Sequence, residues 1–276
     1  MPEGRPEPPL GRVLVVAGSD SGGGAGIQAD IKACMALGAY AGTAITALTA
    51  QDTRGVHGVM PVTPDFVRQQ MLVVLDDIGA DAVKTGMLGS AAVIDAVAGV
   101  LAARRLPLVL DPVMVAKGGA RLLDPAALDA LRRLIPLAKL LTPNVPEAEA
   151  LLDRAIPDHT AAVEAAAALL ALGAEAVLLK GGHLAGPLVR DILVTAEGTT
   201  LLEEARIETR HTHGTGCTLA SAIAAGLSQG MVLVPAVRRA RAYVQAAILA
   251  APGFGTGHGP LQHGVTVDAA WVGVRP

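Results

Sequence analysis

The fold is decided by residues 13–46, which read VLVVAGSDSGGGAGIQADIKACMALGAYAGTAIT. Val13 to Ala17 is a short apolar run of the kind that forms a buried strand, and glycines end it. A helix is predicted from about Gly24 to Leu37, and a second strand around Gly42 to Thr46. Two strands joined by a helix of this length form a parallel βαβ unit with a right-handed crossover. The segment therefore predicts an α/β protein.

The same alternation of strands and helices continues along the chain. Helices are expected at about 63–78, 90–103, 125–134, 145–152, 161–172, 216–228 and 235–250. Strands are expected at 82–85, 106–110, 139–141 and 176–179, and a hairpin at 191–195 and 202–207. This pattern predicts one α/β/α domain over residues 12–276, a three-layer sandwich with a mostly parallel central sheet. Residues 1–11, rich in proline and glycine, are expected to form a disordered tail.

Composition favours a globular protein with a deeply buried sheet. Hydrophobic residues make up 51% of the chain and mean hydropathy is +0.47, but the apolar blocks are short, so we expect no membrane span. The net charge of −3, the scattered basic residues and an aromatic content of 2% argue against a nucleic-acid partner. Two cysteines make no disulfide framework and the N-terminus lacks a secretory pattern, so we predict a cytoplasmic location.

Ligands of parallel sheets bind beyond the carboxyl ends of the strands. Loops that follow predicted strands should therefore meet at one crevice. These loops are Gly18–Gly26, Gln51–Gly55, Gly86–Leu88, Asp111–Gly119, Thr142–Glu147 and Lys180–His183.

The first of these loops is rich in glycine. Glycines between a strand and a helix can expose backbone N–H groups to an anion. The triplet Gly22 to Gly24 meets a dinucleotide-binding pattern only in part, and no Lys-Ser or Lys-Thr follows Gly26 as a Walker A loop requires. A tight turn without a ligand is the alternative interpretation.

A second glycine-rich segment, HTHGTGCT at 211–218, stands directly before an apolar helix. The N–H groups of Gly214 to Cys217 are expected to point at one spot, where the helix dipole adds positive potential. Such a nest suits the charge of a phosphoryl group in transfer, and an ordinary helix entry is the alternative. The position of Cys217 in the first turn predicts a thiol pKa below the free value of roughly 8.5, unless a phosphate lies close.

Three further segments place polar residues at predicted strand ends. In TPNVPEAEALL, Asn144 and Glu147 are spaced either to hold a hydrated Mg²⁺ or to form a helix capping box. Lys180 follows a buried strand and either neutralises a phosphate or is a solvated strand end. In LDPVMVAKGGARLLDP, Asp111 ends a strand, and the turn at Lys117 can fold over a substrate.

Taken together, these motifs resemble those of the bacterial hydroxymethylpyrimidine/phosphomethylpyrimidine kinases, which belong with the pyridoxal kinases to the ribokinase-like superfamily. The resemblance runs from about Val13 to His263. It is carried by seven motifs in the family's order and spacing: AGSDSGGGAGIQAD, ITALTAQDT, KTGML, LDPVMVAKGG, TPNVPEAEAL, LLKGGH and THGTGCT. It implies a ribokinase-like sandwich, usually a homodimer, that uses MgATP to phosphorylate a hydroxymethylpyrimidine and then its monophosphate in thiamin biosynthesis.

The resemblance also implies roles for residues of this chain. The residues expected near the pyrimidine are Gly18, Asp30, Gln51, Met87 and Val113. Those expected at the nucleotide are Asn144, Lys180 and Lys117, and those expected at the metal are Glu147 and Asp111. The expected anion hole is Gly214, Thr215, Gly216 and Cys217, with Cys217 in the place of an aspartate base. The Gln51 amide offers both a donor and an acceptor to an aminopyrimidine edge.

Two departures from the family pattern bear on specificity and on the alternatives. Arg210-His211 stand where the family commonly has Lys-Asn. Ala116 stands where some relatives that also take pyridoxal carry a cysteine, which favours the pyrimidine. A pyridoxal kinase is the nearest alternative, followed by a dinucleotide-dependent oxidoreductase and a pyrimidine-binding sensor without turnover. The oxidoreductase lacks the acidic residue expected after the second strand.

Overall fold

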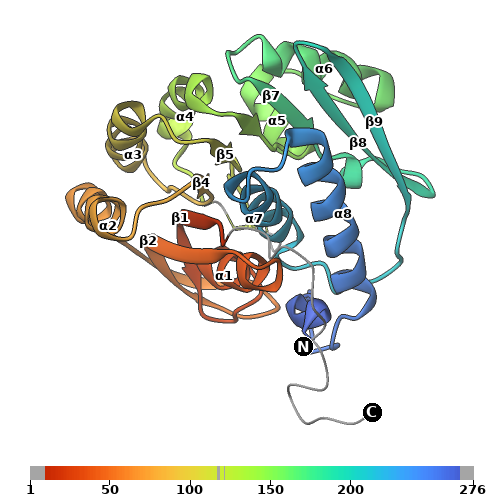
Figure 1. Cartoon of the computed structure of the whole chain (residues 1–276). Coiled ribbons are helices and arrows are strands. Elements are labelled where there is room, and N and C mark those ends of the chain that lie inside the picture. Colours follow the sequence, from red (N-terminus) through yellow and green to blue (C-terminus); the bar gives the residue numbers. More distant parts are fainter. Residues whose placement is uncertain (1–9, 117–118, 121, 268–276) are drawn as a thin grey trace, which may run out of the picture.

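A single sheet organises the protein, whose computed structural model describes residues 10–116, 119–120 and 122–267 (Figure 1). Its strands are β1 (Arg12–Asp20), β2 (Tyr40–Gln51), β3 (Val56–Pro61), β4 (Ala82–Thr85), β5 (Leu108–Leu110), β6 (Leu140–Leu141), β7 (Ala176–Leu179), β8 (Leu188–Thr195) and β9 (Gly198–Ala205). Their order is β3-β2-β1-β4-β5-β6-β7-β8-β9. Pairing is parallel from β2 to β7 and antiparallel where β3, β8 and β9 join the edges. The predicted mostly parallel sheet is confirmed.

Helices cover both faces of this sheet (Figure 1). They are α1 (Gly26–Ala36), α2 (Pro64–Asp77), α3 (Ala91–Arg104), α4 (Leu128–Leu134), α5 (Val145–Leu152), α6 (His159–Leu170), α7 (Thr215–Ser228) and α8 (Leu233–Leu249). One apolar cluster joins α2 to α6 with the sheet, and a second joins α1, α7 and α8 with its other face. This is the α/β/α sandwich that the sequence predicts. In the described part of the chain, no helix has both the length and the apolar character that crossing a bilayer requires.

In the middle of strand β1, residues 13–16 are apolar on both faces of the sheet. Leu14 and Val16 belong to the cluster with α2 to α6, whereas Val13 and Val15 belong to the cluster with α1, α7 and α8. All four are buried, because helices cover both faces of a parallel sheet. Each buried side chain of this size stabilises the fold by about 1.5–3 kcal/mol relative to exposure.

Most predicted elements are present, with differences at the edges of the sheet. Strands β4 and β7 and helix α5 have the predicted bounds. Strand β2 has 12 residues, more than twice the length predicted, and β3 was missed because its side chains are mostly exposed and show no apolar pattern. Gly11, assigned to the tail, belongs to the fold, since its carbonyl accepts a 2.8 Å hydrogen bond from Tyr40. The rest of the predicted tail, apart from Leu10, lies outside the described residues.

Candidate functional site

A cavity of about 720 Å³ lies beyond the carboxyl ends of the parallel strands. Residues from all six predicted loops line it, together with the turn into α7, and the Gln51–Gly55 loop contributes Gln51 alone. The predicted site residues in its wall are Gly18, Gln51, Met87, Asp111, Val113, Asn144, Glu147, Lys180, Gly214, Thr215, Gly216 and Cys217. Asp30 is not among them, and Lys117 lies outside the described residues.

The turn into α7 presents free backbone donors to this cavity. Gly214 caps the helix with φ +82°, a conformation that favours glycine, and a Cβ there would clash with the carbonyl of Gly24. Within the described chain, the N–H groups of Gly214, Gly216 and Cys217 have no hydrogen-bond partner. The N–H of Thr215 is bonded to the carbonyl of Thr212 at 3.3 Å, so the prediction that all four donors are free was wrong for Thr215. Three free donors at a helix N-terminus are an arrangement that can bind an anion.

Cys217 differs from the prediction made for its thiol. Burial raises the pKa of Cys217 to about 11, although the charge of Lys84 and the N–H of Gly26 favour the thiolate. The nearby carboxylates of Asp30 and Asp111 add to the rise. The predicted lowering was wrong, because the helix terminus does not compensate for removal of the sulfur from water. The thiol is therefore protonated at neutral pH.

A buried group of charges lies beside this turn. Lys180 Nζ is 2.8 Å from Asp111 Oδ1 and 4.0 Å from Glu147 Oε2, so two carboxylates share one ammonium group. Thr142 donates to the same Asp111 oxygen at 3.0 Å. A Cβ on Gly216 would lie 3.3 Å from Lys180 Nζ, which places this ammonium at the open helix terminus. The lysine and the three free N–H groups therefore converge.

Asn144 and Glu147 form the capping box that was one of the two interpretations of their spacing. The Asn144 side chain accepts from the Glu147 N–H at 2.9 Å, and Glu147 Oε2 accepts from the Asn144 N–H at 2.7 Å. Burial raises the pKa of Glu147 to about 7, and the Asp111 charge adds to the rise while Lys180 opposes it. A second cation near Asp111 and Glu147 would relieve their repulsion. The donor set suits Mg²⁺, which takes few carboxylates and completes its shell with water and phosphate oxygens.

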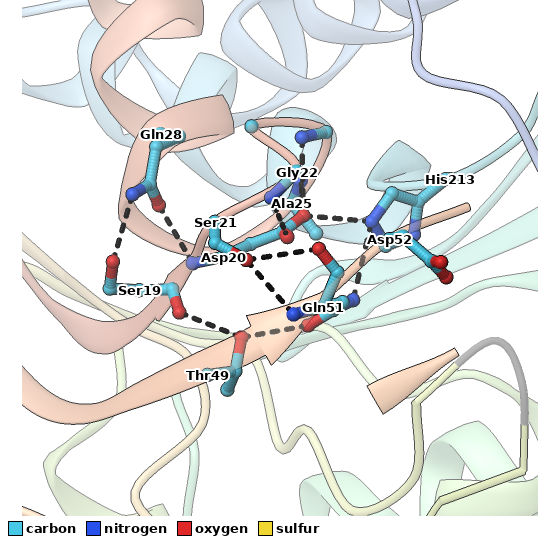
Figure 2. A network of polar contacts seen from close by, with 12 residues as sticks. Ser19, Asp20, Ser21, Gly22, Ala25, Gln28, Thr49, Gln51, Asp52 and His213 are labelled. Carbon is cyan, nitrogen blue, oxygen red and sulfur yellow. Dashed lines mark hydrogen bonds and ion pairs between the residues drawn. The ribbon is translucent and has the colours of Figure 1, made fainter. Parts of the chain in front are cut away.

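Sequence reasoning missed Asp20, which organises the first glycine-rich loop (Figure 2). Its side chain accepts hydrogen bonds from the N–H groups of Gly22, Gly24 and Ala25 at 2.8–3.1 Å, and its carbonyl accepts from Gly23. The loop therefore has no free donor among these four residues for a pyrophosphate. This corrects the anion-binding interpretation of the loop and removes the basis of the oxidoreductase alternative. The acidic residue two positions before the triplet was the available signal.

His213 is the second residue whose role was missed, since the sequence indicated only that a joint metal site of His211 and His213 is improbable. Its Nε2 is 2.8 Å from Asp20 Oδ2 and 3.3 Å from Gln51 Nε2 (Figure 2). Gln51 Oε1 lies 3.1 Å from Thr49 Oγ1, which also donates to the Ser19 carbonyl at 2.9 Å. Asp20, His213 and Gln51 all line the cavity. The position of His213 directly before Gly214 was the signal that pointed to it.

Asp30 was expected near the substrate, but it does not line the cavity and is instead the buried partner of Lys84. Its carboxylate accepts from Lys84 Nζ at 2.8 and 3.0 Å and from Ser221 Oγ at 2.7 Å. All three residues are fully buried, and they connect α1, β4 and α7. A buried charge requires a partner of opposite sign, and the lysine in the otherwise apolar strand β4 supplies it.

Comparison with known proteins places this geometry in context. Residues 20–262 match the profile of the family described as phosphomethylpyrimidine kinase. The chain is 54% identical to the thiamine biosynthesis bifunctional protein ThiED of Geobacter sulfurreducens, over 92% of this chain and 52% of that protein, so it spans about half of that relative's length. It is 50% identical to the hydroxymethylpyrimidine/phosphomethylpyrimidine kinase of Streptomyces coelicolor, over 93% of this chain and 95% of that protein.

A solved structure has the same fold. The Bacillus subtilis pyridoxal kinase, determined as an ADP complex, superposes with a TM-score of 0.87 at 38% identity. The match covers 93% of this chain and 98% of that one.

Proposed function

This chain belongs to the phosphomethylpyrimidine kinase family, and we propose that it uses MgATP to phosphorylate 4-amino-5-hydroxymethyl-2-methylpyrimidine and then the monophosphate, in thiamin biosynthesis. Relatives that carry both activities in their names support the substrate. The observation that carries the proposal is the set of three free N–H groups, at Gly214, Gly216 and Cys217, in the cavity that also holds Lys180 and Gln51.

The chemistry requires positioning more than a strong base. The hydroxymethyl oxygen attacks the γ-phosphorus, the bond from that phosphorus to the ADP oxygen breaks, and the hydroxyl proton is released. Phosphoryl transfer passes through a loose transition state, and the protein catalyses it mainly by positioning the reactants and stabilising the charge on the transferred group. The N–H groups of the α7 turn and the ammonium of Lys180 are placed to stabilise that charge. Cys217, with a thiol pKa of about 11, is at most a modest base.

The nucleotide phosphates and the metal are assigned to the group of charges beside the α7 turn, where a Cβ on Gly216 would lie 3.3 Å from Lys180 Nζ and 3.9 Å from Asp111 Oδ2. We place the phosphates near Asn144 and Lys180, and Mg²⁺ near Asp111 and Glu147, whose mutual repulsion a divalent cation would reduce. Bound Mg²⁺ supplies charge neutralisation between the phosphates. The role proposed for Lys117 stays a prediction. Removal of Mg²⁺ with EDTA should abolish turnover, and excess MgCl₂ should restore it.

A coupled assay tests the proposed activity directly. ADP formation is measured with the hydroxymethylpyrimidine as acceptor and again with its monophosphate, and the products are identified by mass spectrometry. We expect ADP release in both reactions and none without acceptor. ADP release without a phosphorylated pyrimidine would contradict the proposal.

A pyridoxal kinase is the second candidate, favoured by the likeness to the Bacillus subtilis enzyme. Ala116 lines the cavity where a cysteine would be expected in relatives that take pyridoxal, and this supports the pyrimidine. The ratio of kcat/KM for the two alcohols decides between them. We expect the pyrimidine to be preferred.

We also propose that the chain forms a homodimer through the β2–β3 edge. Leu48 and Met60 are paired across these strands and are 45% and 67% exposed, and β3 is the outermost strand of the sheet. Apolar side chains on an edge hairpin are typical of a protein interface. Light scattering should give twice the chain mass of 27.9 kDa, and the pair Leu48→Asp and Met60→Asp should halve it. The predicted cytoplasmic location stays a prediction.

A further inference from the structure

The polar network around Asp20 contains a conflict between donors. His213 Nε2 is 2.8 Å from an Asp20 carboxylate oxygen, which can only accept. Burial alone would raise the pKa of Asp20, but the hydrogen bond from His213 and those from Ala25 and Gly22 bring it below its usual value. Asp20 is thus ionised at neutral pH, and Nε2 carries a proton. The Gln51 –NH₂ at 3.3 Å from Nε2 then faces another donor.

At the other end of the same amide, the Gln51 oxygen also faces a group of its own kind, the oxygen of Thr49. Thr49 has one hydroxyl proton, and the carbonyl of Ser19 at 2.9 Å can only accept it. Thr49 Oγ1 is then left as an acceptor towards Gln51 Oε1 at 3.1 Å, which is an acceptor too. Rotating the amide of Gln51 by 180° about its Cγ–Cδ bond removes both conflicts at once. The single Nε2–H of His213 is then shared between Asp20 at 2.8 Å and the Gln51 carbonyl oxygen at 3.3 Å, and the –NH₂ donates to Thr49 Oγ1.

We infer that the Asp20–His213 pair fixes the orientation of the Gln51 amide, with its oxygen towards His213, and so determines the donor and acceptor order that the cavity presents to a substrate ring. The inference rests on the proposed function for the identity of that ring, an aminopyrimidine. His213 and Asp20 are positioning residues, since they act through Gln51.

The surroundings hold this arrangement rigidly. Asp20 is 2% exposed and His213 is 8% exposed. A Cβ on Gly24 would clash with the His213 ring, so the ring packs directly against the loop backbone. The backbone of Gln51 is held by two 2.9 Å hydrogen bonds with Ser21. With the backbone of Gln51 held in this way, contacts to His213 and Thr49 hold its side-chain amide at both ends.

The inference predicts a particular pattern of kinetic effects. Removing the donor with His213→Leu should raise KM for the pyrimidine by about 10-fold, the cost of a lost buried hydrogen bond, and should change kcat by less than about 3-fold. His213→Gln, which keeps a side-chain N–H donor, should restore most of the affinity. A large loss of kcat with unchanged KM in His213→Leu would instead place His213 in the phosphoryl-transfer machinery and overturn the inference.

A double-variant cycle tests whether His213 acts through Gln51. Gln51→Met should raise KM on its own, and adding His213→Leu to it should raise KM no further. Additive effects would show that the two residues act independently, which contradicts the inference. Melting temperatures of all variants separate these effects from loss of the fold.

A spectroscopic measurement keeps this inference distinguishable from the proposed function. In protein labelled with ¹⁵N-histidine, the long-range ¹H–¹⁵N spectrum should show Nε2 of His213 protonated at pH 7–8, and Asp20→Ala should change that signal. A bare Nε2 would overturn the inference whether or not the pyrimidine is a substrate. A protonated Nε2 in a protein that does not phosphorylate the pyrimidine would refute only the proposed function.

Discussion

Two glycine-rich turns precede helices on the same face of the sheet, and they use their N–H groups in opposite ways. In the loop before α1, the N–H groups of residues 22–25 are all bonded to Asp20. In the turn before α7, those of Gly214, Gly216 and Cys217 have no partner in the described chain. The two turns pack so closely against each other that a Cβ on Gly214 would clash with the Gly24 carbonyl.

The difference between the turns is set by one side chain. Asp20, two residues before the glycine triplet, supplies an internal anion, whereas neither of the two residues before Gly214, Thr212 and His213, is acidic, and His213 donates to Asp20. A glycine-rich helix entry is therefore an anion site for a ligand only where the chain itself provides no anion. The N–H groups of the first turn are used by the chain itself, and those of the second remain free for the phosphoryl group that we propose as the ligand.

The largest expected effect comes from closing the open turn. Gly216→Val places a branched side chain 3.3 Å or less from Lys180 Nζ and displaces the N–H groups at 216 and 217. We expect kcat to fall by at least about 10³-fold, since losing one such donor typically costs about 10²–10³-fold. Gly99→Val, at an exposed position of α3 with open space around it, is the matched control. If Gly216→Val retained full kcat, the open turn would not be the anion hole.

A smaller loss is expected when only the thiol of that turn is changed. Cys217→Ser should lower kcat by about 10²-fold, at the low end of the range for a general base, because the thiol with a pKa of about 11 is protonated at neutral pH. Cys34→Ser is the control, since Cys34 is buried away from the cavity and burial raises its pKa to about 12. A fall beyond about 10⁴-fold would show that the thiol contributes more than the N–H groups.

The sequence predicted the open turn better than the closed one, for a physical reason. The parallel direction of the strands and the convergence of their loops follow from strand–helix alternation, so residues such as Lys180 and Asp111 could be placed at the cavity. Hydrogen bonds that nearby backbone N–H groups donate to a side chain, as at Asp20, depend on a loop conformation that alternation does not specify. Asp30 was misplaced for a related reason: its partner Lys84 comes from a distant strand. The thiol pKa was misjudged because burial is a tertiary property.

Adding a side chain to the loop before α1, whose N–H groups are bonded to Asp20, should affect the stability of the fold more than turnover. Gly24→Ala would push a methyl group into the His213 ring, and we expect a loss of about 1–3 kcal/mol in the free energy of unfolding, as for an overpacked core. KM for the pyrimidine should rise, and kcat should change little. Gly99→Ala serves as the control for the substitution itself. Urea unfolding measures the first quantity. A kcat loss comparable to that of Gly216→Val would mean that the two turns do not have separate roles.

The smallest expected effect is on the pH dependence of stability, through the contact of His263 with the first turn of α7. The Thr218 hydroxyl lies 2.9 Å from Nε2 of His263, and burial lowers the pKa of His263 to about 4. An unfolded histidine has a pKa of about 6.5, so between the two values the unfolded chain binds more protons and stability falls as the pH falls. We expect a loss of about 2 kcal/mol from this group between pH 7.5 and 5, at about 1.4 kcal/mol for each pH unit below 6.5. The pKa of Asp20 is lowered, so Asp20 loses its contribution to stability only at more acidic pH. The groups that hold the two turns therefore lose their contributions in different pH ranges. His263→Gln should be less stable at pH 7.5 but should lack this part of the pH dependence. Equal slopes for the two proteins would show that His263 does not anchor the turn.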